Sequence, residues 1–227
     1  IFLNFVALMF VCVPKTRKML SEAMDRVGKS LLRTMLSRQE GWEQFKSTIE
    51  EQGRNCEHTH EEMKAFVDGD DYTVDYDQNS HIDTMIDMVG IMLPALANRQ
   101  WTLWTVKDGA PDLICCDRPV SLTWTVPVHG PIPPGFGLRN TTLTFPFNRR
   151  IVAISSFEGQ KELELGEPLV AWINSLVGSG GNQIYSSEAD FIWMTQNYQI
   201  GKPDDLIAAL SAEKQRRPDA EYNGTPE

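Results

Sequence analysis

The stretch "WTLWTVKDGAPDLICCDRPVSL", residues 101–122, marks the point where the sequence changes from helical to extended periodicity. Its first six residues alternate and are rich in aromatic and β-branched side chains, which indicates a strand. The "DG" at 108–109 is a turn signal, and "DLICC" is predicted to be the return strand. The "DRP" at 117–119 then turns the chain into another strand over "VSLTWTVPV".

Further strands and helices are predicted downstream of this stretch. "TTLTFPF" and "RIVAISSF" are strands around a turn at 148–150, after a loop rich in proline and glycine at 129–137. Pro168 suits the first turn of a helix that ends before "GSGG", and "NQIYS" is a short strand. Ser187 is a candidate N-cap for a helix over "EADFIWMTQNY", and Pro203 begins a final helix.

Helical periodicity dominates the first part of the chain. Apolar residues spaced three and four apart predict an amphipathic helix over 15–38, and a shorter helix is predicted over 40–53. An acidic connector over 68–80 ends at Ser80, which is the predicted cap of the next helix. The stripe of the first of these helices consists of Leu20, Met24, Val27, Leu31 and Met35.

These elements predict an α+β fold with N-terminal helices, a central antiparallel β meander and C-terminal helices. The predicted division is a helical part over 1–98, an α+β part over 99–218 and a disordered tail over 219–227. At 227 residues the chain is long enough to bury a substantial core.

Charge and cysteine content limit the classes of function. A formal net charge of −10 argues against general nucleic-acid binding, although it leaves a local basic groove open. Four cysteines do not make a disulfide framework, so the sequence predicts free thiols, no disulfides and a cytoplasmic location. No motif for a cofactor is recognised, and none is predicted.

The first residues, "IFLNFVALMFVCV", are apolar throughout. They lack the basic region and cleavage site of a signal peptide, and they are shorter than the roughly 20 residues of a membrane span. Two interpretations stay open: the end of a truncated span, or a buried helix that has lost its upstream partner, which is favoured. Either interpretation predicts that the chain is a fragment.

Three segments of the sequence resemble one family. "RQWTLWTVKDGAPDLICCDRPVSL", "TLTFPFNRRIVAIS" and "INSLVGSGGNQIYSS" are similar to hallmark segments of the domain of unknown function 4238 family, which is mainly bacterial. Cys116 stands where this family commonly has serine, and Phe147 where it commonly has leucine. The family's opening His-x-x-Pro-x-x-x-Leu segment is not found, so the resemblance implies a C-terminal fragment. It implies no established activity.

One polar segment and one cysteine pair are candidate sites for metal binding or catalysis. The segment "NCEHTHEEM", residues 55–63, has two histidines, but their spacing is wrong for a zinc protease and no second cysteine pair follows. It is predicted to be a solvated segment without metal. Cys115 and Cys116 are candidate nucleophiles only if a cation or histidine lowers their pKa. At the end of an apolar strand they are predicted to be packing residues.

Asp117 is the strongest candidate functional residue, although a turn alone explains it. Its carboxylate can accept backbone hydrogen bonds, and Pro119 favours extended geometry before it. The functional alternative makes Asp117 a base or metal ligand, with Arg149 or Arg150 binding an anion.

Two hypotheses about function follow from the sequence. The favoured one is a binding or interaction module, because no complete catalytic set is recognised. The alternative is a hydrolase or nuclease-like enzyme of a microbial conflict system, with Asp117, Arg149 and Arg150 as its catalytic contribution here and the rest in a missing N-terminal region.

Overall fold

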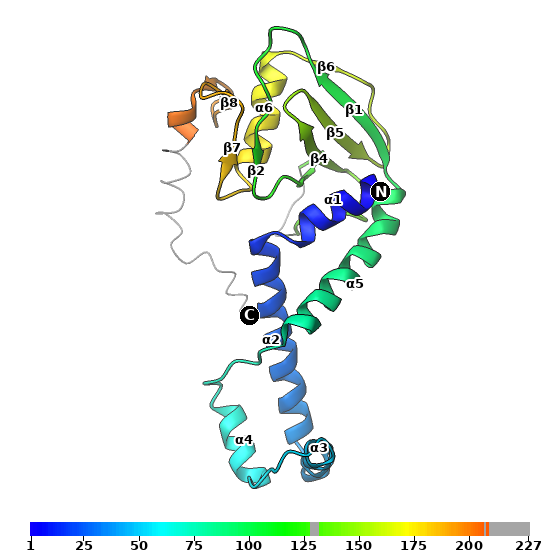
Figure 1. The fold of residues 1–227 in the computed structure, drawn as a ribbon, viewed down its shortest axis with the longest axis vertical. Helices are drawn as coiled ribbons and strands as arrows, with labels where there is room; N and C mark the ends of the chain where they lie inside the picture. The colour runs from blue at the N-terminus through cyan, green and yellow to red at the C-terminus, as the bar shows by residue number, and fades with distance from the viewer. Residues whose placement is uncertain (128–131, 207, 209–227) are drawn as a thin grey trace. The chain divides into compact units, whose positions relative to one another are not determined.

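The computed structural model describes residues 1–127, 132–206 and 208. Helices precede the strands, and a further helix packs against them (Figure 1), which confirms the predicted α+β class. The helices are α1 (Phe2–Val11), α2 (Pro14–Leu36), α3 (Gln39–Glu51), α4 (His60–Asp68), α5 (Gln78–Ala97) and α6 (Glu167–Gly178). The strands are β1 (Gln100–Val106), β2 (Cys115–Cys116), β3 (Ser121–Trp124), β4 (Thr141–Asn148), β5 (Ile151–Ser156), β6 (Glu164–Leu165), β7 (Ile184–Tyr185), β8 (Trp193–Met194) and β9 (Ile200–Gly201).

The chain forms two compact units. The sheet unit contains Ile1–Val13 and the described residues from Asp87 onward, and the helical unit contains Pro14–Ile86. This grouping differs from the predicted division at residue 98, because α1 and the second half of α5 belong with the strands. The predicted tail at 219–227 lies outside the described residues.

The main sheet has the strand order β3-β4-β5-β1-β6. Strands β3, β4 and β5 are consecutive antiparallel neighbours, so the central part is the predicted meander. Strand β1 is antiparallel to β5, with Trp104 opposite Val152, whereas β6 runs parallel to β1. The sheet is therefore mixed at its β6 edge.

The prediction that "DLICC" pairs as a return strand with β1 was wrong. Strand β5 occupies one side of β1 and β6 the other. Strand β2 pairs instead with β7, and Cys115 lies opposite Tyr185. Leu113 and Ile114 are buried in a core cluster with side chains of α6, so burial rather than hairpin pairing determines the course of this segment.

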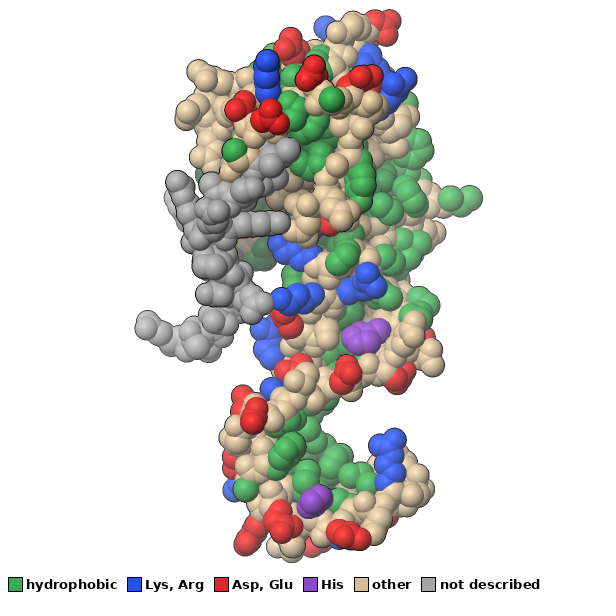
Figure 2. Space-filling view, turned by 60° about the vertical axis from the view of Figure 1, so that its left-hand side comes forward, with side chains coloured by type: hydrophobic (Ala, Val, Ile, Leu, Met, Phe, Trp, Pro, Cys, Tyr) green, Lys and Arg blue, Asp and Glu red, His purple; other side chains and the backbone are tan. Residues whose placement is uncertain are grey.

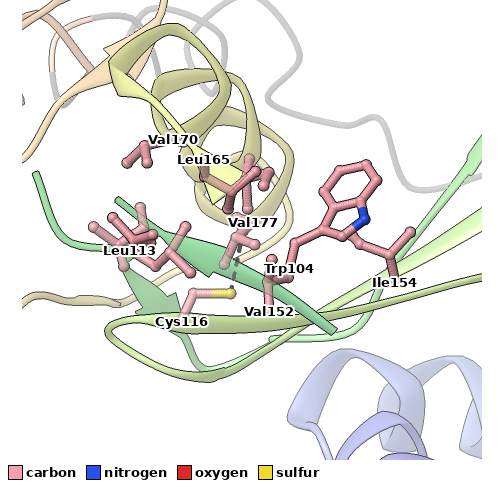
Figure 3. Close-up of a cluster of buried hydrophobic side chains, with 11 residues drawn as sticks. Trp104, Leu113, Cys116, Val152, Ile154, Leu165, Val170 and Val177 are labelled. Carbon is pink, nitrogen blue, oxygen red and sulfur yellow. Dashed lines mark hydrogen bonds between the residues drawn. The ribbon is translucent and has the colours of Figure 1, made fainter. Parts of the chain in front are cut away.

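The two faces of the main sheet are covered by different helices. Helix α6 packs on the face that carries Trp104, Val152 and Ile154, where its Val170 and Val177 join the cluster shown in Figure 3. Alternate residues of a strand point to opposite faces, so other side chains face α1. Phe2 of α1 contacts Trp101 edge-to-face with ring centroids 5.1 Å apart, and Phe5 contacts Phe145 at 5.8 Å.

The helix predicted over "EADFIWMTQNY" was wrong. Strands β8 and β9 pair here, with Met194 opposite Ile200. The hydroxyl of Ser175 accepts a hydrogen bond from the Met194 amide at 2.6 Å, which supplies a tertiary partner for an extended backbone. The final helix predicted from Pro203 has helical backbone as far as Leu206, and most of its remaining length lies outside the described residues.

The helical unit packs α3 and α4 against α2, with a small core of Leu36, Trp42 and Val67. Helix α4 was not predicted, although its start is a capping box. The Thr59 side chain accepts a hydrogen bond from the Glu62 amide, and the Glu62 carboxylate accepts a hydrogen bond from the Thr59 amide. The predicted cap at Ser80 was also wrong, because α5 begins earlier.

Asp77 lies at the start of α5 and has the role that was predicted for Ser80. Its Oδ1 accepts hydrogen bonds from the backbone amides of Asn79 and Ser80 at 2.8 and 3.0 Å. These bonds, chiefly the one from Ser80, lower the pKa of Asp77. An ionised carboxylate is well placed here because the first amides of a helix are unpaired donors.

The predicted apolar stripe of α2 is only partly covered within the helical unit. Val27 and Leu31 are more than half exposed, and apolar side chains are visible at the surface over the helices of this unit (Figure 2). The buried face is instead the one that carries Gly28, Leu32 and Leu36. Periodicity therefore located the helix but not its packed face.

Gly28→Ala is expected to destabilise the helical unit. A Cβ at this position would lie 2.8 Å from Cγ1 of Val74 and 3.1 Å from the Tyr76 hydroxyl. Relieving this overlap costs about 1–3 kcal/mol, which outweighs the gain of about 1 kcal/mol in helix propensity. The measurement is hydrogen exchange of the α2 amides.

Gly90→Ala is the matched control, because a Cβ there has no neighbour within 4 Å. Gly90 lies within α5, so this substitution is expected to slow hydrogen exchange locally through propensity alone. An increase in protection for both variants would contradict the close approach of Val74 to α2.

Candidate functional site

A hollow with a volume of about 220 Å³ lies where the β4–β5 turn meets the β2–β7 pair. Two aromatic side chains border it and are largely exposed, Phe147 at 56% and Tyr185 at 54%. The residues that line it are Leu113, Ile114, Cys115, Pro146, Phe147, Asn148, Arg149, Tyr185, Ser186 and Ser187.

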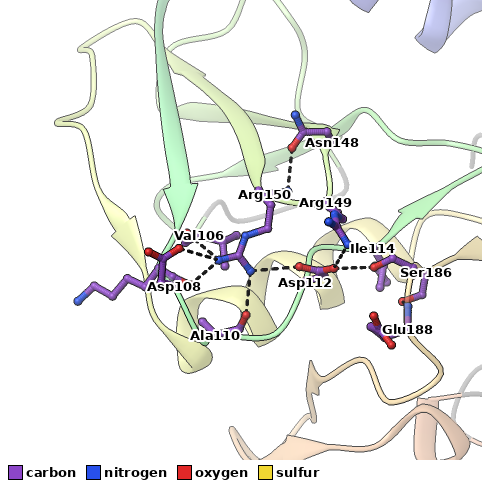
Figure 4. Close-up of polar contacts among 12 residues, drawn as sticks. Val106, Asp108, Ala110, Asp112, Ile114, Asn148, Arg149, Arg150, Ser186 and Glu188 are labelled. Atoms are coloured by element: carbon purple, nitrogen blue, oxygen red, sulfur yellow. Dashed lines mark hydrogen bonds and ion pairs between the residues drawn. The ribbon is translucent and has the colours of Figure 1, made fainter.

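Arg150, a predicted site residue, uses its side chain to hydrogen-bond the end of β1 and the loop that follows it. Its Nη1 donates to the Ala110 carbonyl at 2.9 Å and to Oδ1 of Asp112 at 3.1 Å. Its Nη2 donates to the carbonyls of Val106 and Lys107 at 3.1 and 2.6 Å. All four terminal N–H groups of this guanidinium are thus used within the fold (Figure 4).

Arg149, the neighbouring residue, is placed very differently. Its side chain is 63% exposed, and its one contact among the described residues is between Nη1 and Oδ2 of Asp112 at 3.6 Å. That distance is an ion pair but too long for a hydrogen bond. The backbone is nonetheless fixed, because the Arg149 carbonyl accepts from the Leu113 amide at 2.9 Å. Arg149 therefore offers donors to a ligand on an anchored turn.

Asp112 connects the two arginines, and sequence reasoning did not select it. Its side chain is only 12% exposed, and Oδ2 accepts a hydrogen bond from the Ser187 hydroxyl at 2.6 Å. That hydrogen bond lowers the pKa of Asp112 most, and the positive charges of Arg150 and Arg149 lower it further. The carboxylate is therefore ionised at neutral pH, and Figure 4 shows it between its partners.

Asn174 of α6 fixes the segment that lies beneath the hollow. It is fully buried, and its Oδ1 accepts from the Ile114 amide at 2.9 Å. Its Nδ2 donates to the carbonyls of Asp112 and Ile192 at 3.2 and 2.8 Å. One side chain thus satisfies one buried and two partly buried backbone groups from two segments distant in sequence.

Asp117, the strongest candidate from the sequence, has a structural role. Its Oδ1 accepts hydrogen bonds from the backbone amides of Asn182 and Gln183 at 2.8 and 3.2 Å. A Cβ at Gly181 would lie 2.6 Å from the same oxygen, so the loop closes on the carboxylate only with glycine there. Among the described contacts neither arginine pairs with Asp117, because both pair with Asp112.

The two adjacent cysteines differ in burial, and the pKa of each thiol is raised. Burial raises the pKa of Cys115 and raises that of Cys116 to about 11. The thiol of Cys116 donates a hydrogen bond to the Val177 carbonyl at 3.2 Å (Figure 3). It accepts one from the Arg118 amide, also at 3.2 Å. This environment favours the protonated thiol, as for a packing residue rather than a nucleophile.

Alkylation should therefore distinguish the cysteines. We expect iodoacetamide to modify exposed Cys12 first at pH 7 and Cys116 only after unfolding in urea. The raised pKa also makes stability depend on pH, because the folded protein holds the Cys116 proton more tightly than the unfolded chain does. This stabilisation is fully present below pH 9 and is lost as the pH rises towards about 11. Mass spectrometry of digested samples measures each site. Modification of native Cys116 at pH 6 as fast as at pH 8 would contradict this assignment.

The polar segment 55–63 is also used by the fold. Cys56 packs against the core of the helical unit, and Nε2 of His60 lies 2.8 Å from the Leu36 carbonyl. The described part of the chain contains no group of three or more His, Cys, Asp or Glu side chains that could hold a metal ion. The four cysteines are free thiols.

Comparison of the chain with family models, curated proteins and solved structures finds no match. Among the described residues, no helix combines the length and apolar character needed to cross a membrane.

Proposed function

We propose that the chain is a binding or interaction module whose recognition surface is the hollow beside Arg149. The observation that carries this proposal is the combination of exposed Phe147, Tyr185 and Arg149 around one preformed depression. Aromatic residues and arginine are enriched among the residues that dominate protein interfaces. The free cysteines support action in a reducing cytoplasm. The resemblance to the domain of unknown function 4238 family supports a prokaryotic origin.

The size of the hollow favours a segment of another protein as its occupant. At about 220 Å³ it is smaller than the roughly 300–1,000 Å³ of pockets that enclose drug-sized ligands. It fits one anchoring side chain or chain end, with the exposed rings making contacts around it. Such a central anchor with surrounding contacts is typical of peptide recognition.

A display library of random peptides tests this proposal. Peptides selected on the wild-type protein are expected to lose about tenfold or more in affinity for a Phe147→Ala, Tyr185→Ala variant. Tyr198→Asn is the control, because Tyr198 is 87% exposed and has a left-handed backbone that asparagine tolerates. Selected peptides that bind both variants as the wild type does, or selection that yields no binder, would overturn the proposal.

A further inference from the structure

We infer that the hollow binds a carboxylate carried by an apolar or aromatic group, and that Arg149 holds this carboxylate. The inference rests on the proposed function and specifies its ligand. A segment of another protein supplies this chemistry through its chain end or an acidic side chain next to an apolar one, and a small aromatic acid stands in for it in the test. Among the described contacts, Arg149 alone is free to bind this carboxylate, although the sequence favours neither of the two adjacent arginines.

The first support is the distribution of hydrogen-bond donors. The four terminal N–H groups of Arg150 are donated to three carbonyls and to Asp112. Arg149 makes one ion pair through Nη1, and its Nε and Nη2 have no described partner. These two nitrogens form the edge of a guanidinium that accepts a carboxylate through two parallel hydrogen bonds.

The second support is local charge. Two guanidinium groups meet one carboxylate of low exposure, Asp112, since Asp108 at 3.9 Å from Arg150 is fully exposed and weakly coupled. Among these ion pairs, Arg149 and Arg150 thus share one poorly exposed carboxylate, so Asp112 leaves part of the arginine charge unneutralised. A bound anion would neutralise this remaining charge without competing for the hydrogen bonds of Arg150.

The third support is the apolar part of the lining. Phe147 and Tyr185 border the hollow, with Leu113 and Ile114 among the lining residues. A bare phosphate would gain nothing from these surfaces, and phosphate sites commonly supply several donors at once. One free guanidinium beside aromatic walls matches an acid with an apolar body.

Protein NMR with benzoate and its neutral isostere benzamide tests the inference. Benzoate is expected to shift the amides of Cys115 and Tyr185 with a Kd on the order of millimolar, typical of so small a ligand. Benzamide should bind about tenfold or more weakly, because it cannot form the charge-assisted pair. Inorganic phosphate, titrated alone, should shift these amides less than benzoate does.

Two charge-matched variants isolate Arg149. Arg149→Gln should bring benzoate affinity down to that of benzamide, while the amides around Arg150 keep their positions. Arg139→Gln removes the same charge at the far end of β4, where Arg139 is exposed, and should leave benzoate binding unchanged.

Each other outcome overturns the inference in a distinguishable way. Equal binding of benzoate and benzamide would leave the recognition surface standing and remove the role of the carboxylate. Phosphate binding as strong as that of benzoate would replace it with a general anion site. No shift at the hollow with any probe would reject the ligand class, and the peptide selection then decides the proposed function separately.

Discussion

Replacement of Arg99 by methionine is expected to lower the free energy of unfolding of the sheet unit by about 3–5 kcal/mol. Arg99 is 3% exposed and donates five hydrogen bonds. Its acceptors are the Ser155 hydroxyl and carbonyl, the Thr141 hydroxyl and carbonyl, and the Phe136 carbonyl. Methionine fills much of the volume but leaves these buried acceptors without their donor.

The geometry explains why lysine should not rescue the loss. The five donors of a guanidinium are fixed in one plane, and here they bridge β4 and β5 while the group lies over the Phe157 ring at 4.8 Å. Burial lowers the pKa of Arg99, yet a guanidinium starts so far above neutrality that it keeps its charge. Arg99→Lys has only three donors around one atom, so a loss of about 2 kcal/mol or more is expected.

Urea unfolding followed by tryptophan fluorescence measures this effect in the correct unit, since Trp42 is the one tryptophan of six outside the sheet unit. Arg139→Met, at an exposed position, is the control and should change stability by less than about 0.5 kcal/mol. A loss below about 1 kcal/mol for Arg99→Met would show that the network is not a major stabilising feature.

The acceptors of Arg99 also show where prediction from the sequence stops. Alternation of aromatic and β-branched residues located β1, β4 and β5, because this signal is local. Nothing local marks Arg99 as buried, since its partners lie 37–56 residues away. Arg149 and Arg150 make the same point at the candidate site: they are identical and adjacent, and only tertiary contacts make one structural and the other free.

Two errors of prediction have distinct physical causes. The spacing of Thr59 and Glu62 is a capping-box signature, so α4 could have been predicted from the sequence. The segment after Ser187 could not, because its helical pattern is overridden by tertiary bonds. The Ser187 hydroxyl donates to Asp112, and Ser175 binds both the amide and the carbonyl of Met194.

Replacement of Asn174 by leucine is expected to cost the sheet unit about 3–5 kcal/mol as well. Leucine has a similar size, so the loss does not come from a cavity. It comes from the buried amide of Ile114 and from the partly buried carbonyls of Asp112 and Ile192, which all lose their hydrogen-bond partner. Urea unfolding followed by fluorescence again gives the measurement.

Asn182→Leu is the control, since Asn182 is exposed and its hydrogen bond to Asp117 uses only the backbone amide. A change below about 0.5 kcal/mol is expected there. If both variants lost equal stability, the loss could not be assigned to the buried hydrogen bonds of Asn174.

Asn174 has a second consequence because it holds the segment from which Asp112 and the lining of the hollow project. In Asn174→Leu this segment loses two of its anchors, so the ion pair between Asp112 and Arg149 is expected to loosen even under conditions where the unit stays folded. Benzoate affinity should then fall although Arg149 is intact. Unchanged benzoate binding in a folded Asn174→Leu protein would show that the β4–β5 turn alone positions Arg149.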